Sequence, residues 1–226
     1  MCPAGLDDIP EFASEIAARI NSSAALKTAE IRNIRREYSK LLKNAAPELV
    51  LDLASRLLGQ SGFTNRFVAY ELICHHRPAL ASLGKKELEQ LGAGMDQWAA
   101  VDTFACYLSG PAWRERQVAD AVIHCWARSP DRWWRRAALV STVPLNNKAR
   151  GGGGDGARSL AVCRLLVADR DDMVEKALSW SLRELAKRDA PAVVAFLEES
   201  QERLAARVLR EVRNKLRTGL KNPRKA

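Results

Sequence analysis

Apolar residues recur every three or four positions along most of this chain, the spacing that places them on one face of a helix. In residues 8–20, for example, Ile9, Phe12, Ile16 and Ile20 share one face. The same pattern predicts further helices over residues 24–42, 47–58, 65–78, 85–91, 96–108, 111–127, 131–142, 157–168, 171–187, 191–199 and 201–218. No segment alternates apolar and polar residues in the way that predicts a strand. We therefore predict an all-α chain.

The predicted helices follow one another at intervals of about 15–20 residues, so that a pair of them spans roughly 35–40 residues. This period is typical of HEAT and armadillo arrays, in which stacked helical pairs bury a continuous core and leave a concave face. A compact helical bundle is the competing architecture, but many short helices favour stacking. The prediction depends on period and length alone, because no repeat consensus is visible.

Residues 150–156, with the sequence RGGGGDG, interrupt the helical rhythm. A glycine-rich loop can cradle phosphate, but a P-loop needs a preceding strand and a following Gly-Lys-Ser/Thr, and neither is present. We predict a flexible connection between two helices. Its basic flank could still contact a nucleic-acid backbone.

The basic residues of the chain are concentrated at its C-terminal end. The 226 residues carry a formal net charge of +9, with a sequence pI near 9.6. From Arg203 onward the sequence contains nine basic residues and one acidic residue, Glu211, so this end carries +8 and the rest of the chain +1. Such a segment on a nearly neutral body is typical of a polyanion binder, although a solvated helix end with a frayed tail explains it equally well.

The composition is that of an ordinary globular protein, with 47% hydrophobic and 28% charged residues. No run of 18 apolar residues occurs, so we expect no membrane span. The acidic N-terminal residues lack the apolar core of a secretory signal. The five cysteines form no Cys-x-x-Cys pair, which predicts reduced thiols in the core. We therefore expect a cytoplasmic protein.

One pair of residues near the middle of the chain is unusual. Trp98 and Asp102 lie four positions apart in a predicted helix, so that an indole and a carboxylate share one face. An unpaired carboxylate is costly in a core. A cleft suits the pair better, with a cationic group held between ring and carboxylate.

Two further segments contain tryptophans that could contact a ligand rather than pack in the core. The chain has six tryptophans, most of which we expect to anchor the core. Trp133 and Trp134 are adjacent, so their side chains point about 100° apart on a helix and cannot share one apolar contact. Arg135 and Arg136 follow at once, and aromatic rings beside arginines suit contact with bases, sugars and phosphates. Trp180 stands between two serines, which leave room for its ring to face a cleft.

Other reactive side chains give weaker signals. The Cys-His-His sequence at residues 74–76 contains metal-ligand types, but adjacent histidines cannot reach one ion from a regular helix. No second ligand pair lies at zinc-like spacing, so we predict no metal site. His124 lacks a cysteine-protease signature around it. The acidic residues 169–172 read as a helix N-cap and first turn.

Taken together, these segments resemble the DNA alkylation repair enzymes of the AlkD type. The resemblance is carried by Trp98-x-x-x-Asp102, by RRAAL at residues 135–139 and by WSLRE at residues 180–184. Residues 29–37 and 209–219 are also similar to terminal segments of that family, so the likeness extends roughly over residues 10–221. The main departure is the polyglycine stretch, which resembles an insertion.

The resemblance implies a single domain over residues 1–226, built as a right-handed α–α superhelix (a solenoid) of HEAT-like helical repeats with a concave basic face. Residues 150–156 are then an inter-helix loop and residues 219–226 a basic tail. It also implies DNA glycosylase activity on cationic N3- and N7-alkylated purines in double-stranded DNA, with the nucleotide still in the duplex. No metal and no organic cofactor is implied, and we expect a monomer with no membrane partner.

By the same resemblance, Asp102 corresponds to the catalytic carboxylate, and Trp98 and Trp180 to the aromatic walls of the cleft. An alkylated purine cation is already a good leaving group, so no strong general acid is needed. As the glycosidic bond stretches, positive charge develops on the sugar, and a carboxylate can stabilise it and orient or deprotonate water. Indole faces favour the cationic base through cation–π contacts of about 0.5–2 kcal/mol each.

The candidate DNA contacts are basic. Arg136 corresponds to a backbone-contacting arginine of the resembled family, and Arg135 is the less certain neighbour. The basic end supplies three further candidates: Arg213, Lys215 and Arg217.

Two other functions remain open. A non-catalytic helical-repeat protein could bind DNA or branched nucleic acid through a basic face, but it would not need Asp102. A protein–protein scaffold explains the helices, but neither the tryptophan and arginine segments nor the basic end.

Overall fold

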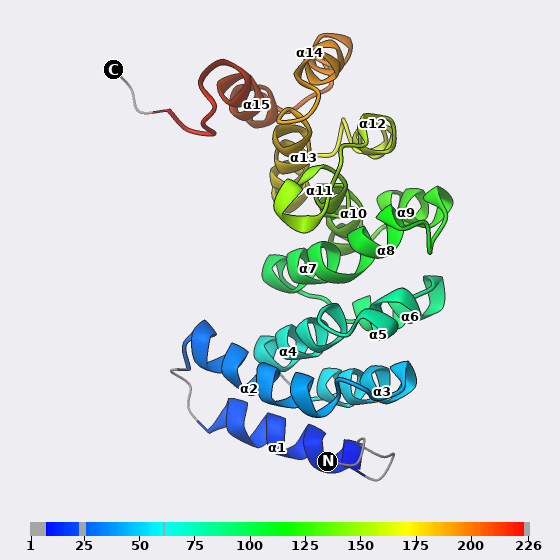
Figure 1. The fold of residues 1–226 in the computed structure, drawn as a ribbon. Helices are drawn as coiled ribbons and strands as arrows, with labels where there is room; N and C mark the ends of the chain where they lie inside the picture. The colour runs from blue at the N-terminus through cyan, green and yellow to red at the C-terminus, as the bar shows by residue number, and fades with distance from the viewer. Residues whose placement is uncertain (1–7, 23–25, 61, 224–226) are drawn as a thin grey trace. The chain divides into compact units, whose positions relative to one another are not determined.

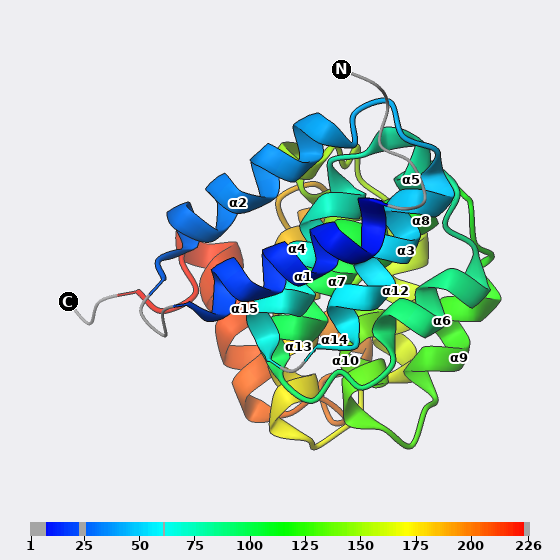
Figure 2. The ribbon, with the colours of Figure 1, turned by 90° about the horizontal axis from the view of Figure 1, so that it is seen from below.

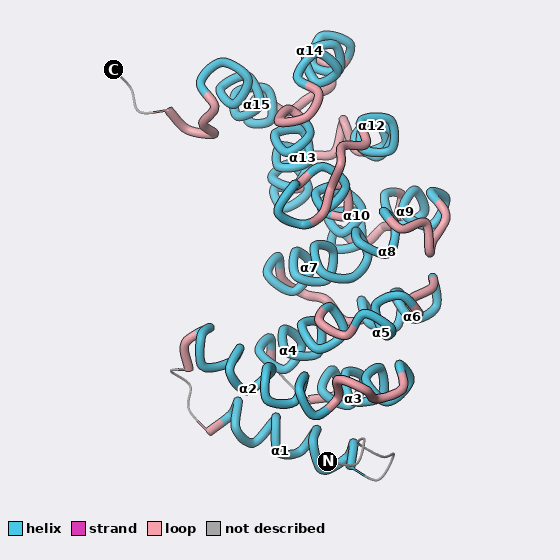
Figure 3. The backbone as a smooth tube through the Cα atoms, in the orientation of Figure 1, coloured by secondary structure: helices cyan, strands magenta, loops and turns pink. Residues whose placement is uncertain are grey.

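The computed structural model describes residues 8–22, 26–60 and 62–223, which form helices and loops with no strand (Figure 3). The prediction of an all-α chain is therefore confirmed. The chain divides into two compact units, Met1–Gly94 and Met95–Ala226. No helix in the described ranges has both the length and the hydropathy needed to cross a membrane. Of the basic end, Arg224 and Lys225 lie outside the described residues.

The first unit contains helices α1 (Asp8–Asn21), α2 (Thr28–Leu41), α3 (Pro47–Leu58), α4 (Phe63–Cys74), α5 (Arg77–Ala81) and α6 (Lys85–Gly92) (Figure 1). Helix α3 packs against α1 and α4, and α2 packs against α4. The buried Glu71 carboxylate of α4 accepts from Arg32 Nε at 2.9 Å and from Arg35 Nε at 3.1 Å. These ion pairs join α2 to α4 inside the unit.

The second unit begins with helix α7 (Trp98–Phe104), the π-helical turn η1 (Ala105–Ser109) and helix α8 (Gly110–Arg114). It continues with α9 (Asp120–Ala127), α10 (Arg132–Val140), α11 (Val143–Asn146), the 3₁₀ turn η2 (Lys148–Arg150), α12 (Gly156–Leu165), α13 (Asp172–Leu185), α14 (Ala190–Glu199) and α15 (Ala206–Thr218). Helix α10 packs against α7, α9 and α13, and α13 packs in turn against α12 and α15 (Figures 1 and 2). Helix α10 is therefore the centre of this unit, and its residues 137–140 are fully buried.

Residues 111–127 do not form the single helix that the apolar pattern predicts. A turn follows α8, in which Arg116 adopts a left-handed φ of 60°. Helix α9 then begins at Asp120, whose Oδ1 accepts from Nε1 of the buried Trp113 at 2.7 Å. The pattern missed the break because Val118, within the turn, is buried like a helical core residue.

Two other predicted helices have different ends. The helix predicted for residues 65–78 ends at Cys74, because His76 caps a new helix whose first turn holds Pro78. Proline lacks the N–H that a helix interior requires but is tolerated in a first turn. The helix predicted for residues 201–218 begins only at Ala206, after a turn.

None of the four cysteines within the described residues forms a disulfide bond. Cys106 and Cys163 are buried, as predicted, and burial raises the pKa of each thiol to about 12. Cys125 is exposed, however, so the prediction of a core thiol is wrong there. Buried thiols with a high pKa stay protonated and unreactive at neutral pH.

The π-helical turn η1 follows α7 directly and continues into α8. Gly110, just beyond this turn, lies so close to α11 that an added Cβ would stand 2.6 Å from Pro144 Cγ and 2.7 Å from the Ala105 carbonyl oxygen. Only glycine allows this close packing. Isolated π turns are often found at functional sites.

The polyglycine segment connects the 3₁₀ turn η2 to α12, as predicted for an inter-helix connection, while its flexibility stays a prediction. Backbone hydrogen bonds hold it: Gly152 N donates to Asn147 O and Gly154 N donates to Leu145 O, both at 2.9 Å. Arg188 Nη2 donates to Gly152 O at 2.6 Å. A Cβ at Gly152 would stand 2.5 Å from the Pro144 carbonyl oxygen.

Gly152→Ala is expected to lower the free energy of unfolding by about 1–3 kcal/mol, because the new methyl group must push the loop off the backbone of α11. Gly153→Ala is the matched control, since a Cβ at Gly153 meets nothing within 4 Å. It should change the free energy of unfolding by less than about 0.5 kcal/mol. Urea unfolding measures both values. Equal losses in the two variants would contradict this account of the loop.

Candidate active site

Asp102 lies on α7, one helical turn after Trp98, so the two side chains leave the helix on the same side. The Trp98 ring is 56% exposed, and it is the one aromatic ring among the exposed large apolar side chains of the described residues. The Asp102 side chain is only 16% exposed. A mostly buried carboxylate therefore stands beside a tryptophan that is open to solvent.

The partner of Asp102 is Arg136, from α10. Arg136 is 5% exposed, and its Nε and Nη2 donate to the Oδ1 and Oδ2 atoms of Asp102, each at 2.8 Å. Such a two-point ion pair fixes both the position and the plane of the carboxylate. The third nitrogen, Nη1, donates to the Met173 carbonyl oxygen at 2.5 Å. Arg136 thus joins α7, α10 and α13.

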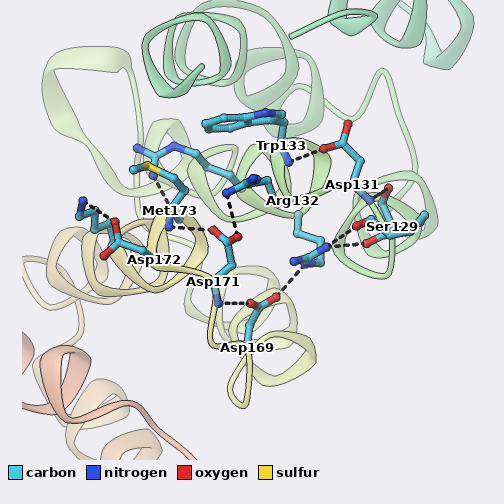
Figure 4. Close-up of polar contacts among 12 residues, drawn as sticks. Ser129, Asp131, Arg132, Trp133, Asp169, Asp171, Asp172 and Met173 are labelled. Atoms are coloured by element: carbon cyan, nitrogen blue, oxygen red, sulfur yellow. Dashed lines mark hydrogen bonds and ion pairs between the residues drawn. The ribbon is translucent and has the colours of Figure 1, made fainter. Parts of the chain in front are cut away.

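The first turn of α13 is held by carboxylates (Figure 4). Asp171 is the N-cap, and it accepts from Met173 N at 2.9 Å. Asp171 N donates in turn to Asp169 Oδ1 at 2.9 Å. The reading of residues 169–172 as a cap and first turn is therefore confirmed. Because the cap fixes Met173, it also fixes the carbonyl group that Arg136 uses.

Two other arginines of α10 hold the same cap (Figure 4). Arg132 Nη1 donates to Asp171 Oδ2 at 3.2 Å, and Arg135 Nε donates to Asp169 Oδ2 at 2.7 Å. Arg135 Nη1 also donates to the backbone carbonyls of Ser129 and Pro130, at 3.1 and 2.8 Å. The structure thus places Arg135 among protein partners, while its predicted contact with DNA stays a prediction.

Burial raises the pKa of the Asp102 carboxyl above its ordinary value, and the hydrogen bonds and charge of Arg136 offset part of that rise. The two effects oppose each other at one group. The ionised form of Asp102 therefore depends on Arg136, since without that guanidinium only the desolvation would remain.

Trp180 lies on α13, seven residues after Met173, which is about two helical turns and nearly the same side of the helix. Its serine neighbours are fully buried. Ser179 Oγ donates to Glu211 Oε2 on α15, and Ser181 Oγ is 2.6 Å from Thr142 Oγ1. The serines thus point into the unit, and Trp180 is half-buried between them.

Trp133 and Trp134 separate as predicted. The Trp134 ring packs on Trp126, with centroids 4.8 Å apart, and on Phe104 at 6.0 Å. Trp133 instead lies under the Arg132 guanidinium, and the Arg132 Cζ atom is 5.6 Å from the centroid of the Trp133 ring. Trp134 is therefore a packing residue, whereas Trp133 belongs to the surface around the α13 cap.

The basic residues of α15 are only partly available to a ligand. Arg207 pairs with Asp172, and Lys221, just beyond the end of α15, places its Nζ atom 3.3 Å from Glu211 Oε1. The three predicted DNA contacts lie between these two residues. Arg213 Nη2 donates to Gln201 Oε1 at 2.7 Å, Lys215 Nζ donates to Gly219 O at 2.5 Å, and Arg217 is exposed. Together with Arg210, Asn214 and Leu216, Arg213 and Arg217 line a shallow hollow.

The structure brings together Asp102 and Arg136, with Trp98 one turn away on the same helix and Trp180 on the helix that Arg136 contacts. Sequence reasoning missed the Met173 carbonyl, because a backbone oxygen leaves no sequence signal. It predicted the cap at residues 169–172, but not that this cap fixes the Met173 carbonyl group to which Arg136 donates. Chemically, the arrangement presents a fixed carboxylate beside aromatic surface.

Comparison with known protein families identifies one family over most of the chain. The family model described as DNA alkylation repair enzyme matches residues 19–216, which include every predicted site residue except Arg217. None of the curated proteins gives a match to the chain.

Arg136→Ala is expected to lower the free energy of unfolding by about 3 kcal/mol, because it leaves the buried Asp102 carboxylate and the Met173 carbonyl without their donor. Arg132→Ala is the matched control. It also removes an arginine–aspartate pair from α10, but the Arg132 side chain is 54% exposed. Its loss should stay below about 1 kcal/mol. Urea unfolding would contradict this assignment if the two variants were equally stable.

Proposed function

The chain belongs to the DNA alkylation repair enzyme family, and we propose that it is a monofunctional DNA glycosylase that hydrolyses the N-glycosidic bond of cationic N3- and N7-alkylated purines in duplex DNA. The observation that carries this proposal is the Asp102 carboxylate, which Arg136 fixes at two points beside the exposed Trp98 ring. The proposal includes a single HEAT-like solenoid, right-handed and with a concave basic face that contacts the duplex.

In the proposed reaction, the bond between C1′ of the sugar and the base nitrogen breaks, and its electron pair leaves with the base. The departing base is thereby neutralised, and positive charge appears on the sugar. The Asp102 carboxylate stabilises that charge, because a preorganised carboxylate in a site of low polarity acts strongly on it. Water then adds to C1′ and its proton passes to Asp102 or to solvent, leaving an abasic site with an intact strand.

Asp102 can act in this way while it remains bound to Arg136. Each carboxylate oxygen has two acceptor positions, and the ion pair uses one on each. The remaining positions can accept a water hydrogen. In this proposal Arg136 is a positioning residue rather than the backbone-contacting arginine that the family resemblance implies, since it is buried and holds the carboxylate ionised and correctly oriented.

Trp98 and Trp180 provide the proposed selectivity for cationic bases. An indole face attracts a cation by about 0.5–2 kcal/mol, and it attracts a neutral base much less. The exposure of Trp98 supports this role, because an indole that is 56% exposed is available to a ligand. An intact duplex needs an open surface of this kind rather than a deep pocket.

The decisive test uses a duplex with a single N7-methylguanine, and the assay measures free base released in single-turnover conditions. Wild type should release base well above the spontaneous rate, and Asp102→Asn should reduce the rate by about 100-fold or more. Asp96→Asn is the matched control, because Asp96 is an exposed aspartate six residues earlier in the chain. It should keep the wild-type rate.

A wild-type protein that binds the duplex but releases no base above the spontaneous rate would overturn the enzymatic proposal in favour of a non-catalytic DNA binder. An Asp102→Asn variant with the wild-type rate would overturn the assigned mechanism instead.

Replacing Arg213, Lys215 and Arg217 together by glutamine should weaken duplex binding and flatten its salt dependence. Each lost phosphate contact lowers the slope of log K against log salt by about 0.9. Arg164→Gln is the control, because Arg164 is exposed but paired with Glu199 on α14. Fluorescence anisotropy at several salt concentrations measures the slope. An unchanged slope in the triple variant would remove these residues from the proposed DNA surface.

A further inference from the structure

The first unit contains a pocket of about 180 Å³ that the proposed glycosylase reaction does not use. It lies where the C-terminal ends of α2 and α4 meet the first turns of α3 and α5. Its lining consists of Ser39, Leu42, Lys43, Val50, Leu72, His75, His76, Arg77 and Pro78. The volume is several times that of one water molecule and smaller than a typical pocket for a drug-sized ligand.

His76 is the most informative residue of this pocket, because it is only 7% exposed. It caps α5, where its Nδ1 atom accepts from Ala79 N at 3.1 Å. A ring nitrogen that accepts carries no proton, so the Nε2 atom on the other edge of the neutral ring must be the donor. This Nε2 atom is buried and has no hydrogen-bond partner among the described residues.

A second polar group of the pocket residues is also buried without a hydrogen-bond partner. The Ser39 Oγ atom, from the last turn of α2, is buried and has no partner within the described structure. Buried polar atoms are almost always paired. Two unpaired polar atoms on residues that line one small pocket therefore need an explanation. An acceptor held in the pocket would satisfy both.

The charges around the pocket indicate the kind of acceptor. Lys43 and Arg77 belong to the lining, which holds no aspartate or glutamate. The nearest buried carboxylate of α4, Glu71, is already paired with Arg32 and Arg35. The remaining walls are four apolar side chains and His75, whose Nδ1 atom lies 2.8 Å from the Glu71 carbonyl oxygen. Two neutral donors and two cations in a small, partly apolar pocket fit a compact anion with several acceptor oxygens.

We propose that this pocket binds one phosphate-sized oxyanion, with Ser39 Oγ and His76 Nε2 as hydrogen-bond donors and with Lys43 and Arg77 as counter-charges. The phosphate could belong to a DNA backbone or be free in solution, since the recognition chemistry is the same. The site does not depend on the proposed glycosylase activity, because all its residues lie in the first unit and the candidate active site lies in the second.

The test follows the side-chain nitrogens of the three histidines of the full-length protein by nitrogen-15 NMR while inorganic phosphate is added at constant ionic strength and pH. The His76 Nε2 signal should shift with saturation. The His124 signal is an internal control, because its Nε2 atom is also buried and unpaired but lies outside the pocket. A His76 signal that does not move, or that moves equally with chloride, would overturn the proposal and leave only water in the pocket.

Two variants separate binding from folding. Ser39→Ala removes an unpaired hydroxyl group, so the protein should fold normally and bind phosphate at least about tenfold more weakly. His76→Asn keeps an N-cap acceptor for Ala79 N but lacks the Nε2 donor, and it should weaken binding similarly. Ser82→Ala is the control, because Ser82 Oγ is bonded to Ala79 O. Wild-type affinity in Ser39→Ala would overturn the proposal.

The source of the phosphate is decided with an unmodified DNA duplex. If the duplex shifts the His76 signal and inorganic phosphate competes with it, the pocket binds a backbone phosphate. If only inorganic phosphate shifts the signal, the pocket binds free phosphate. Both results support an oxyanion site, and base release by Asp102 is measured separately, so that either function can fail without the other.

Discussion

The two-point ion pair between Asp102 and Arg136 is the interaction on which the candidate active site depends. A buried ion pair of this kind contributes little net stability, because desolvation of both groups opposes their attraction. Its effect is on geometry instead. Arg136 uses its remaining nitrogen on the Met173 carbonyl, so that one guanidinium fixes the positions of α7, α10 and α13 around a single carboxylate. Any change in the packing of these helices therefore moves the group to which we assign the chemistry.

The support for this ion pair extends to the surface. The Asp171 cap sets the first turn of α13, and Arg132 and Arg135 hold the carboxylates of that cap from α10. Three arginines of one helix thus serve one neighbouring helix end, although the sequence suggests that such arginines bind a polyanion. Positive charge in this chain therefore has more than one use, since the arginines of α10 organise the site while Arg217 on α15 is exposed. Counting charges alone cannot separate them.

Much of the fold could be predicted from the sequence, because the 3.6-residue period of apolar residues identifies helices directly. The same reasoning correctly separated Trp133 from Trp134. It failed at the turn around Arg116, where a buried Val118 continues the apolar pattern through a left-handed residue. It identified Asp102 but not its bond to Arg136, because residues 34 positions apart show no pairing signal in one sequence. The pocket beside His76 could not be predicted either, because a sequence does not show which buried polar atoms lack partners, as Ser39 Oγ and His76 Nε2 do.

In the proposed reaction, Arg136 acts through Asp102 rather than through a phosphate of the DNA. A double-mutant cycle of Asp102→Asn and Arg136→Gln, read by single-turnover release of N7-methylguanine from a duplex, tests it most directly. If Arg136 acts through Asp102, each single variant should be slow and the double variant no slower than Asp102→Asn alone. If the two losses multiply in the double variant, Arg136 acts independently of the carboxylate, and the ion pair does not have the proposed role.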